Sequence, residues 1–138
     1  AIGNRIYGCD DCLSVCPWNK FAQKTKDPAF LPREELVGPE LAKLADLSDD
    51  GFRKLFSKTS IKRIGRDRFI RNVLIAIGNS GDPALLSSVT PRLSDASHIV
   101  REAANWALIE LSGTGLTKNG RYEAKQTTQS LIDWREPK

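Results

Sequence analysis

Methionine is absent from this chain of 138 residues, which begins with alanine. Because a complete, unprocessed translation product begins with methionine, we expect the chain to be a piece of a longer protein.

Long apolar runs are also missing. No stretch approaches the roughly 18 apolar residues of a membrane-spanning helix, and the N-terminus lacks the basic and then apolar pattern of a secretory signal. Hydrophobic residues make up 40% of the chain and charged residues 28%, which is typical of one soluble domain. We therefore expect a cytoplasmic protein with no membrane partner.

Catalytic groupings are scarce. The only histidine is His98, and Asp10, Asp11 and Asp133 form no convincing catalytic pair. The sequence has no arrangement of nucleophile and base and no glycine-rich phosphate loop. We therefore predict no catalytic residue in this chain and expect His98 to be a surface or packing residue.

Cysteine occurs three times, all within a short run: Cys9, Cys12 and Cys16, the last followed by Pro17. The end of this C-x2-C-x3-C-P spacing is the tail of the bacterial ferredoxin run C-x2-C-x2-C-x3-C-P, which binds 4Fe–4S clusters. An odd number of cysteines argues against a disulfide scaffold. Zinc is the alternative, but its sites commonly add further Cys or His ligands, and here the only histidine is far along the chain. We interpret the three cysteines as iron–sulfur ligands.

Three thiolates cannot complete a four-thiolate cluster. In two-cluster ferredoxins the cysteine before proline ligates the other cluster, so by that logic Cys9 and Cys12 serve one cluster and Cys16 a second. The remaining ligands must then come from upstream sequence, and we expect no intact cluster in this chain by itself.

The sequence from Pro39 onward predicts helices and no strand of consequence. Apolar residues recur there at spacings of three and four, between turns and caps typical of helix ends. We therefore predict a ferredoxin-type segment over residues 1–35, poorly anchored in the chain alone, and an all-α domain over residues 36–138. The expected helices are one after Pro39, one capped by Ser48, one over residues 66–79, one opened by Pro83, one beginning near Val100 and one over residues 121–132.

Two stretches of this helical part repeat at an offset of 30 residues: FIRNVLIAI from Phe69 and IVREAANWA from Ile99. A helix–turn–helix unit with a period of about 30 residues is typical of an α-solenoid, and residues 82–111 resemble a HEAT-like repeat. We therefore predict a HEAT-like helical repeat (α-solenoid), in which Arg101 bonds the preceding turn and Trp106 lies in the core.

Basic residues are concentrated between Arg53 and Arg71, where eight of them accompany one acid, Asp67. Most such clusters are solvated helix faces, and that interpretation stays open. Five of the eight lie within ten residues that span a turn into a helix, and a helix N-terminus flanked by cations favours phosphate. RNA binding would draw most of its affinity from phosphate neutralisation. The predicted RNA contacts are Lys62, Arg63, Arg66, Arg68, Arg71 and Asn72.

The chain closely resembles epoxyqueuosine reductases, as the C-terminal part of that family. The run IGNRIYGCDDC over residues 2–12, with CPWN at 16–19, carries the specific likeness, and KRIGR at 62–66 and FIRN at 69–72 follow it. The HEAT-like repeat alone would not be specific.

The resemblance implies an oxidoreductase with two 4Fe–4S clusters and cobalamin, which reduces epoxyqueuosine to queuosine at the tRNA wobble position. It implies that Cys9, Cys12 and Cys16 are cluster ligands in the full-length protein, that the clusters pass electrons to cobalt, and that the helical domain helps to hold tRNA. The cobalamin region, the upstream four-cysteine motif and the family's catalytic acid all precede Ala1, so we expect the chain alone to be inactive. The expected partners are tRNA carrying epoxyqueuosine and an external electron donor, and the expected state is a monomer.

Two other classes stay open. One is a ferredoxin-type electron-transfer module on a HEAT-like protein-interaction scaffold, which would need no basic surface for RNA. The other is a pure HEAT-like interaction module whose cysteines are vestigial or bind zinc.

Overall fold

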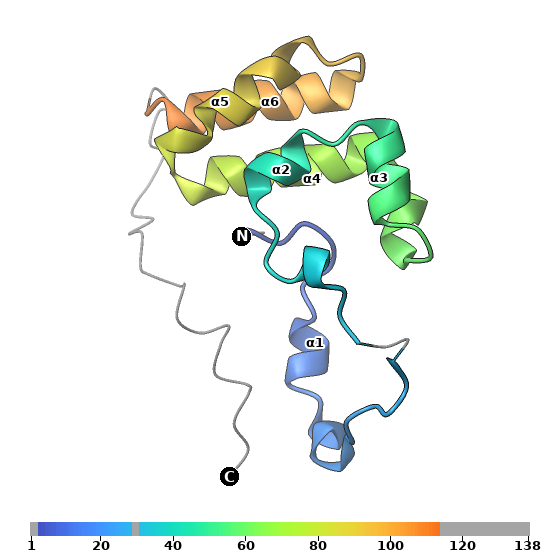
Figure 1. Ribbon diagram of the computed structural model, residues 1–138. Coiled ribbons are helices and arrows are strands. Elements are labelled where there is room, and N and C mark those ends of the chain that lie inside the picture. The colour runs from blue at the N-terminus through green and yellow to red at the C-terminus, as the bar shows by residue number, and fades with distance from the viewer. Residues whose placement is uncertain (1–2, 29–30, 114–138) are drawn as a thin grey trace.

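The computed structural model describes residues 3–28 and 31–113, and every regular element in those two ranges is a helix (Figure 1). The predicted all-α class is therefore confirmed for this part of the chain, while the helix predicted over residues 121–132 lies outside it. The elements, with η marking 3-10 helices, are α1 (Asp11–Ser14), η1 (Pro17–Phe21), η3 (Glu34–Leu36), α2 (Leu41–Ala45), α3 (Asp49–Leu55), η4 (Ser60–Ile64), α4 (Arg66–Ser80), η5 (Pro83–Leu85), α5 (Leu86–Val89), η6 (Thr90–Ser94) and α6 (His98–Leu111).

The two long helices, α4 and α6, pack against each other and form the centre of the helical part (Figure 1). Helix α2 packs against α4, while α5 and η6 pack against α6. The two stretches that align in sequence also have similar burial, since several residues at matching positions of α4 and α6 are buried. The buried pairs are Ile70 with Val100, Val73 with Ala103, Leu74 with Ala104 and Ile77 with Ala107.

Helix α3 begins where the sequence predicts. The Ser48 side chain caps it, since its hydroxyl oxygen accepts a hydrogen bond of 3.1 Å from the Gly51 N–H, the usual role of serine at an N-cap. Phe52 and Phe56 are buried, and their rings lie 5.4 and 4.8 Å from the Phe69 ring of α4. This aromatic cluster joins α3 to the start of α4.

Trp106 does not lie in the core, contrary to the sequence prediction. Its side chain is 36% exposed, and one edge of the indole covers Gly78 on α4. A Cβ atom at Gly78 would lie 2.5 Å from Cζ3 of Trp106, so only glycine lets the ring approach α4 this closely. The repeat pattern placed Trp106 on the correct helix, but the middle of the buried stripe of α6 consists of the small residues Ala103, Ala104 and Ala107, and the larger ring lies at its edge.

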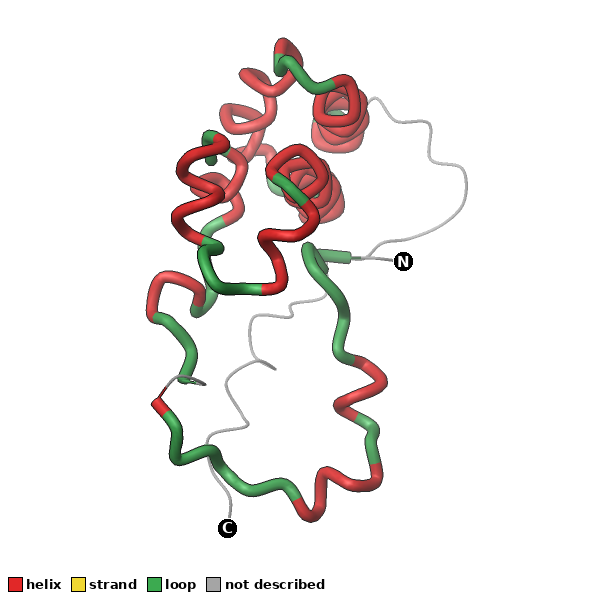
Figure 2. Tube along the Cα trace, turned by 90° about the vertical axis from the view of Figure 1, so that its right-hand side faces the viewer, coloured by secondary structure: helices red, strands yellow, loops and turns green. Residues whose placement is uncertain are grey.

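The cysteines lie on an arm that leaves the helical part. Residues 3–6, the root of the arm, pass along α4, and residues 7–28, here called the cysteine arm, extend away from it (Figures 1 and 2). The chain rejoins the helical part at η3, where Leu36 packs against the core and Arg33 donates a 2.6 Å hydrogen bond to the Leu55 carbonyl. The predicted poor anchoring therefore does not hold for the root, which has defined contacts.

No helix in the described ranges is both long enough and apolar enough to cross a membrane.

Candidate functional site: cysteine arm and basic groove

Cys9 lies in a sharp bend of the backbone. Gly8 and Asp10, on either side of it, have φ values of 70° and 52°. Left-handed backbone is natural for glycine and tolerated by aspartate. The bend leads directly into α1, which contains Cys12, and Cys16 follows after its end. Cys9 and Cys12 are exposed and Cys16 is half-buried, with all three thiols free.

Side chains from both ends of the motif hold the single turn of α1. Arg5 pairs with Asp11 at 2.8 Å, which places a salt bridge at the first turn. The Asn19 amide donates to the carbonyls of Leu13 at 2.7 Å and Ser14 at 3.3 Å. The Leu13 carbonyl also accepts from the Cys16 N–H at 3.2 Å, so Asn19 adds to the hydrogen bonds that close the end of this short helix. This role of Asn19 was not predicted, since the only signal in the sequence is a polar side chain shortly after Pro17 and Trp18.

The three thiols have the donor chemistry of a metal site but do not gather into one by themselves. Within residues 3–28 and 31–113, no group of three or more Cys, His, Asp or Glu side chains lies close enough together to hold a metal ion. Thiolates are nevertheless the ligands that iron–sulfur clusters use, and the exposed thiols of Cys9 and Cys12 are open to ligands from elsewhere. The assignment of the three cysteines to iron–sulfur clusters stays a prediction.

The tip of the cysteine arm exposes large apolar side chains. Trp18 and Phe21 are 72% and 62% exposed, and their rings lie 5.6 Å apart. Leu13 and Val15 on the neighbouring turn are exposed as well. Clustered apolar side chains of this size at a surface mark a contact site, so the arm carries a surface fit for protein contact beside its cysteines.

A groove lies between the root of the arm and the helical part. It has a volume of about 380 Å³ and is lined on one side by Ile6, Tyr7 and Gly8, directly before Cys9. The opposite side carries two cations together with apolar and amide side chains: Ile64, Arg68, Arg71, Asn72 and Ile99. We call this the basic groove. In the groove, part of the predicted RNA-binding segment lies opposite the residues that directly precede the cysteine motif.

A second depression continues from the basic groove along α4 and α6. It has a volume of about 300 Å³, shares Arg71 and Ile99 with the basic groove, and ends at Trp106. Glu102 is the acid in its wall. The exposed face of the Trp106 indole therefore belongs to the same continuous surface as Arg71.

Five of the six predicted RNA contacts separate into three groups. Lys62 and Arg63 lie exposed on η4, outside the lining of the basic groove. Arg68 and Arg71 are exposed on α4 and line it. Asn72 lines it too, but its amide donates to the Ile6 carbonyl at 2.9 Å and its oxygen accepts from Arg71 at 3.1 Å.

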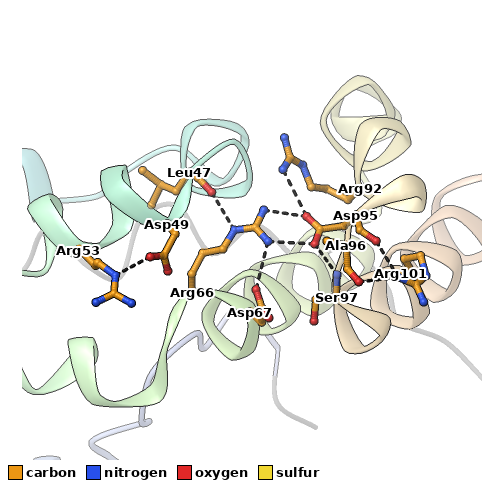
Figure 3. Close-up of polar contacts among 10 residues, drawn as sticks. All are labelled: Leu47, Asp49, Arg53, Arg66, Asp67, Arg92, Asp95, Ala96, Ser97 and Arg101. Carbon is orange, nitrogen blue, oxygen red and sulfur yellow. Dashed lines mark hydrogen bonds and ion pairs between the residues drawn. The ribbon is translucent and has the colours of Figure 1, made fainter.

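Arg66, the remaining predicted contact, has a structural role (Figure 3). Its side chain is 14% exposed and its guanidinium donates to both carboxylate oxygens of Asp95, at 3.0 and 2.7 Å. It also donates to the Leu47 carbonyl at 3.1 Å and to Asp67 at 3.2 Å. Arg66 thus joins the start of α4 to the turn before α3 and the turn before α6, which leaves it poorly available to a ligand.

Asp95 is the acceptor at the centre of this network. The hydrogen bond from Arg66, aided by the Ser97 N–H and the nearby Arg92, lowers the pKa of the Asp95 carboxyl below its ordinary value, against the effect of burial. Arg101 donates to the backbone carbonyls of Asp95 and Ala96 at 2.8 and 2.9 Å. The predicted bond from Arg101 to the preceding turn is therefore present.

His98 is also where the sequence analysis expected it, at the surface. Its side chain is 71% exposed and lies 3.6 Å from Glu102.

Comparison with curated proteins identifies relatives of this chain. No family model matches it. An epoxyqueuosine reductase of Alicycliphilus denitrificans is 43% identical, over 79% of this chain and 32% of the relative. Those of Xanthomonas campestris and Escherichia coli are 41% and 39% identical, each over 79% of this chain and over 31% and 29% of their own lengths.

Solved structures agree with the sequence matches. A crystal structure of epoxyqueuosine reductase with an epoxyqueuosine-modified tRNA-Tyr stem loop superposes with a TM-score of 0.74 and 31% identity, over 90% of this chain and 36% of that one. The Bacillus subtilis enzyme superposes with a TM-score of 0.73 and 32% identity, over 80% of this chain and 30% of that one.

The recognition made from the sequence is confirmed: the chain is a relative of epoxyqueuosine reductases in both sequence and fold. It spans about a third of the length of the curated relatives that it matches, a share that fits the expected C-terminal portion.

Proposed function

We propose that this chain forms part of an oxidoreductase that reduces epoxyqueuosine in tRNA to queuosine. The observation that carries the proposal is its likeness, at 31% identity and a TM-score of 0.74, to an epoxyqueuosine reductase solved with an epoxyqueuosine-modified tRNA stem loop. The curated relatives near 40% identity support the same activity. The remaining two thirds of the enzyme's length would supply the catalytic acid and the cobalamin site.

In this proposal Cys9, Cys12 and Cys16 are ligands of two 4Fe–4S clusters whose other ligands lie outside the chain. Support comes from the ferredoxin-type spacing and from the exposure of Cys9 and Cys12 on an arm that reaches away from the helical part. When bound, the clusters and cobalamin would supply electron transfer from an external donor. The chain's own part is to hold the thiols, through the bend at Cys9 and the side-chain caps of α1.

The helical part would act as a HEAT-like domain that binds tRNA. Arg68 and Arg71 offer two exposed cations at the base of the arm, where a phosphate of the tRNA backbone would lie close to the cysteine motif. Phosphate neutralisation by such cations gives affinity without reading the base sequence. The enzyme would act in the cytoplasm as a monomer, with residues 1–35 as the ferredoxin-type segment and 36–138 as the helical domain.

The test is reduction of the modified nucleoside by the full-length protein. Purified enzyme loaded with iron–sulfur clusters and cobalamin is incubated anaerobically with a reductant and with tRNA carrying epoxyqueuosine. Mass spectrometry of the digested nucleosides should show epoxyqueuosine replaced by queuosine. An unchanged epoxyqueuosine content, with the same protein still binding the tRNA, would contradict the proposal.

A ferredoxin-type carrier on an interaction scaffold makes a different prediction. Such a protein would hold the clusters and pass electrons to another redox protein, but it would neither need the basic groove nor convert the nucleoside. The same assay therefore separates the two functions.

A further inference from the structure

We propose that Asn72 and Asn79 are positioning residues that fasten the root of the cysteine arm to α4 and so set the place of the cysteines beside the basic groove. The Asn72 amide donates to the Ile6 carbonyl at 2.9 Å, and the Asn79 amide donates to the Gly3 carbonyl at 2.8 Å. The fastening rests on this geometry alone. Its consequence for catalysis rests on the proposed function.

The two asparagines suit this role by their spacing on the helix. They lie seven residues apart, about two turns, so both side chains project from one face of α4. Their separation along the helix axis is about 10.5 Å, from a rise of 1.5 Å per residue. Three residues of chain, from Gly3 to Ile6, span at most about 10 Å. The Asn79 amide can therefore hold the first residue of the root, and the Asn72 amide its last residue, along the helix.

The root is part of the wall of the basic groove. Ile6 packs against the core, and Ile6, Tyr7 and Gly8 line the groove opposite Arg68 and Arg71. Cys9 follows directly. Holding the root at Ile6 therefore fixes the position of Cys9 relative to the cations of α4.

Asn72 also connects the arm with a cation of the groove. Its oxygen accepts from Nη1 of Arg71 at 3.1 Å while its amide donates to Ile6. One side chain thus orients both the guanidinium offered to a phosphate and the backbone that leads to Cys9. This contact makes Asn72 a positioning residue rather than the RNA contact that its place in the basic segment predicts.

Limited proteolysis of this chain tests the fastening without any cofactor or substrate. Arg5 lies between the two held carbonyls, so trypsin can cut after it only when the root leaves α4. Asn72→Leu and Asn79→Leu keep the number and branching of the side-chain heavy atoms and the net charge but remove the donor. Each should speed cleavage after Arg5 about fivefold and the pair about 30-fold, as expected for one and two net hydrogen bonds. Cleavage after Lys24, exposed on the arm outside the root, is the internal reference.

Asn105→Leu is the matched control. Asn105 is exposed on α6 and is not one of the two donors to the root, so this variant should cleave after Arg5 at the rate of the unchanged protein. The same rate in the Asn72→Leu, Asn79→Leu pair would overturn the fastening.

Kinetics of the full-length enzyme test the positioning. Asn79 lies outside the lining of the basic groove, so Asn79→Leu should leave the dissociation constant for tRNA unchanged and lower turnover about fivefold. Asn79→Gln, which keeps the amide donor on an exposed side chain, should recover most of the turnover. A purely structural role would lower thermal stability and leave turnover per folded enzyme unchanged, which would overturn the positioning.

The proteolysis and the kinetics together separate this inference from the proposed function. If the unchanged full-length enzyme reduces no epoxyqueuosine, the proposed function fails and the proteolysis still decides the fastening. If it does reduce epoxyqueuosine and Asn79→Leu turns over at the same rate, the positioning fails and the proposed function stands.

Discussion

Asp95 illustrates how one buried carboxylate can join three parts of the chain. Its side chain is 7% exposed and accepts both hydrogen bonds of the Arg66 guanidinium. Arg66 in turn reaches the Leu47 carbonyl, and Arg92 lies 3.6 Å from Asp95 while also pairing with Asp46. Arg92 leaves its Nε atom buried and without a partner among the described residues. The network therefore depends on Asp95 to balance two arginines.

Asp95→Asn should destabilise the protein by about 3 kcal/mol at neutral pH, because it removes the buried carboxylate that accepts both hydrogen bonds of Arg66 and leaves only the exposed Asp67 to balance that mostly buried guanidinium. Urea unfolding measures this free energy. Glu102→Gln, which neutralises an exposed acid of α6, is the control and should change it by less than about 0.5 kcal/mol.

The pH dependence of this difference has a definite sign. The pKa of Asp95 is lowered in the folded state, chiefly by the hydrogen bond from Arg66. The stabilisation is therefore complete above the ordinary carboxyl pKa of about 3.9 and is lost as the pH falls through the lower folded value. The free-energy difference between the original protein and Asp95→Asn should shrink only in acid. A difference that instead grew below about pH 4 would refute the assignment.

Gly78 and Trp106 give a second prediction at the residue scale. Alanine in place of glycine inside a helix normally stabilises by about 1 kcal/mol, but here its Cβ would meet the Trp106 ring at 2.5 Å. Gly78→Ala should therefore destabilise by about 1–3 kcal/mol. In a Trp106→Ala background the same change should stabilise, and thermal unfolding of all four proteins would show this reversal of sign. Stabilisation in both backgrounds would mean that the ring moves away freely.

At the scale of elements, α4 has two faces with different tasks. One face packs against α6 and the aromatic cluster of α3, and the other presents Arg68, Arg71 and the two asparagines. The fastening by Asn72 and Asn79 belongs to this scale, since it joins α4 to the arm.

Charge reversal on this face should weaken tRNA binding. Arg68→Glu with Arg71→Glu is expected to lower the affinity of the full-length protein at least about tenfold and to reduce the slope of log affinity against log salt by about two, one for each phosphate contact. Gel shifts at two salt concentrations measure both. Arg53→Glu with Lys54→Glu makes the same change in charge on α3, outside the groove, and should have a smaller effect. Equal losses in the two pairs would show that only net charge matters.

The elements of the helical part could be predicted because their signals are local. Ser48 followed by two acids marks the start of α3, and the apolar spacing of α4 gives its length to within one residue of the observed Ser80. The repeat of α4 in α6 matches four pairs of buried positions but fails at Trp106, which is exposed where its counterpart Ala76 is buried. Such signals lie within one or two helical turns of the residues that they describe.

The candidate site was only partly predictable because its decisive contacts join distant residues. In the sequence Arg66 looks like an RNA contact, because Asp95, the acceptor of its guanidinium, lies 29 residues later. Asn72 and Asn79 meet carbonyls 66 and 76 residues away, and a backbone carbonyl leaves no trace in a sequence. The cysteine motif, in contrast, can be recognised in the sequence because metal-ligand spacing is itself a local pattern, and its assignment to iron–sulfur clusters stays a prediction.

At the scale of the whole molecule, the chain resembles about a third of an epoxyqueuosine reductase. It combines an arm with three free cysteines and a helical part with an exposed basic groove. We expect the exposed Trp18 and Phe21 at the tip of the arm to contact the rest of such an enzyme. The central claim is that these cysteines are cluster ligands there.

The iron bound by the full-length protein tests this claim most directly. Cys9, Cys12 and Cys16 are each replaced by alanine, and iron content and the cluster's visible absorbance are measured after anaerobic purification, with thermal unfolding to show that each variant remains folded. We predict that every replacement lowers bound iron and weakens the absorbance, because each thiolate is a ligand. Unchanged iron and absorbance in all three folded variants would contradict the account.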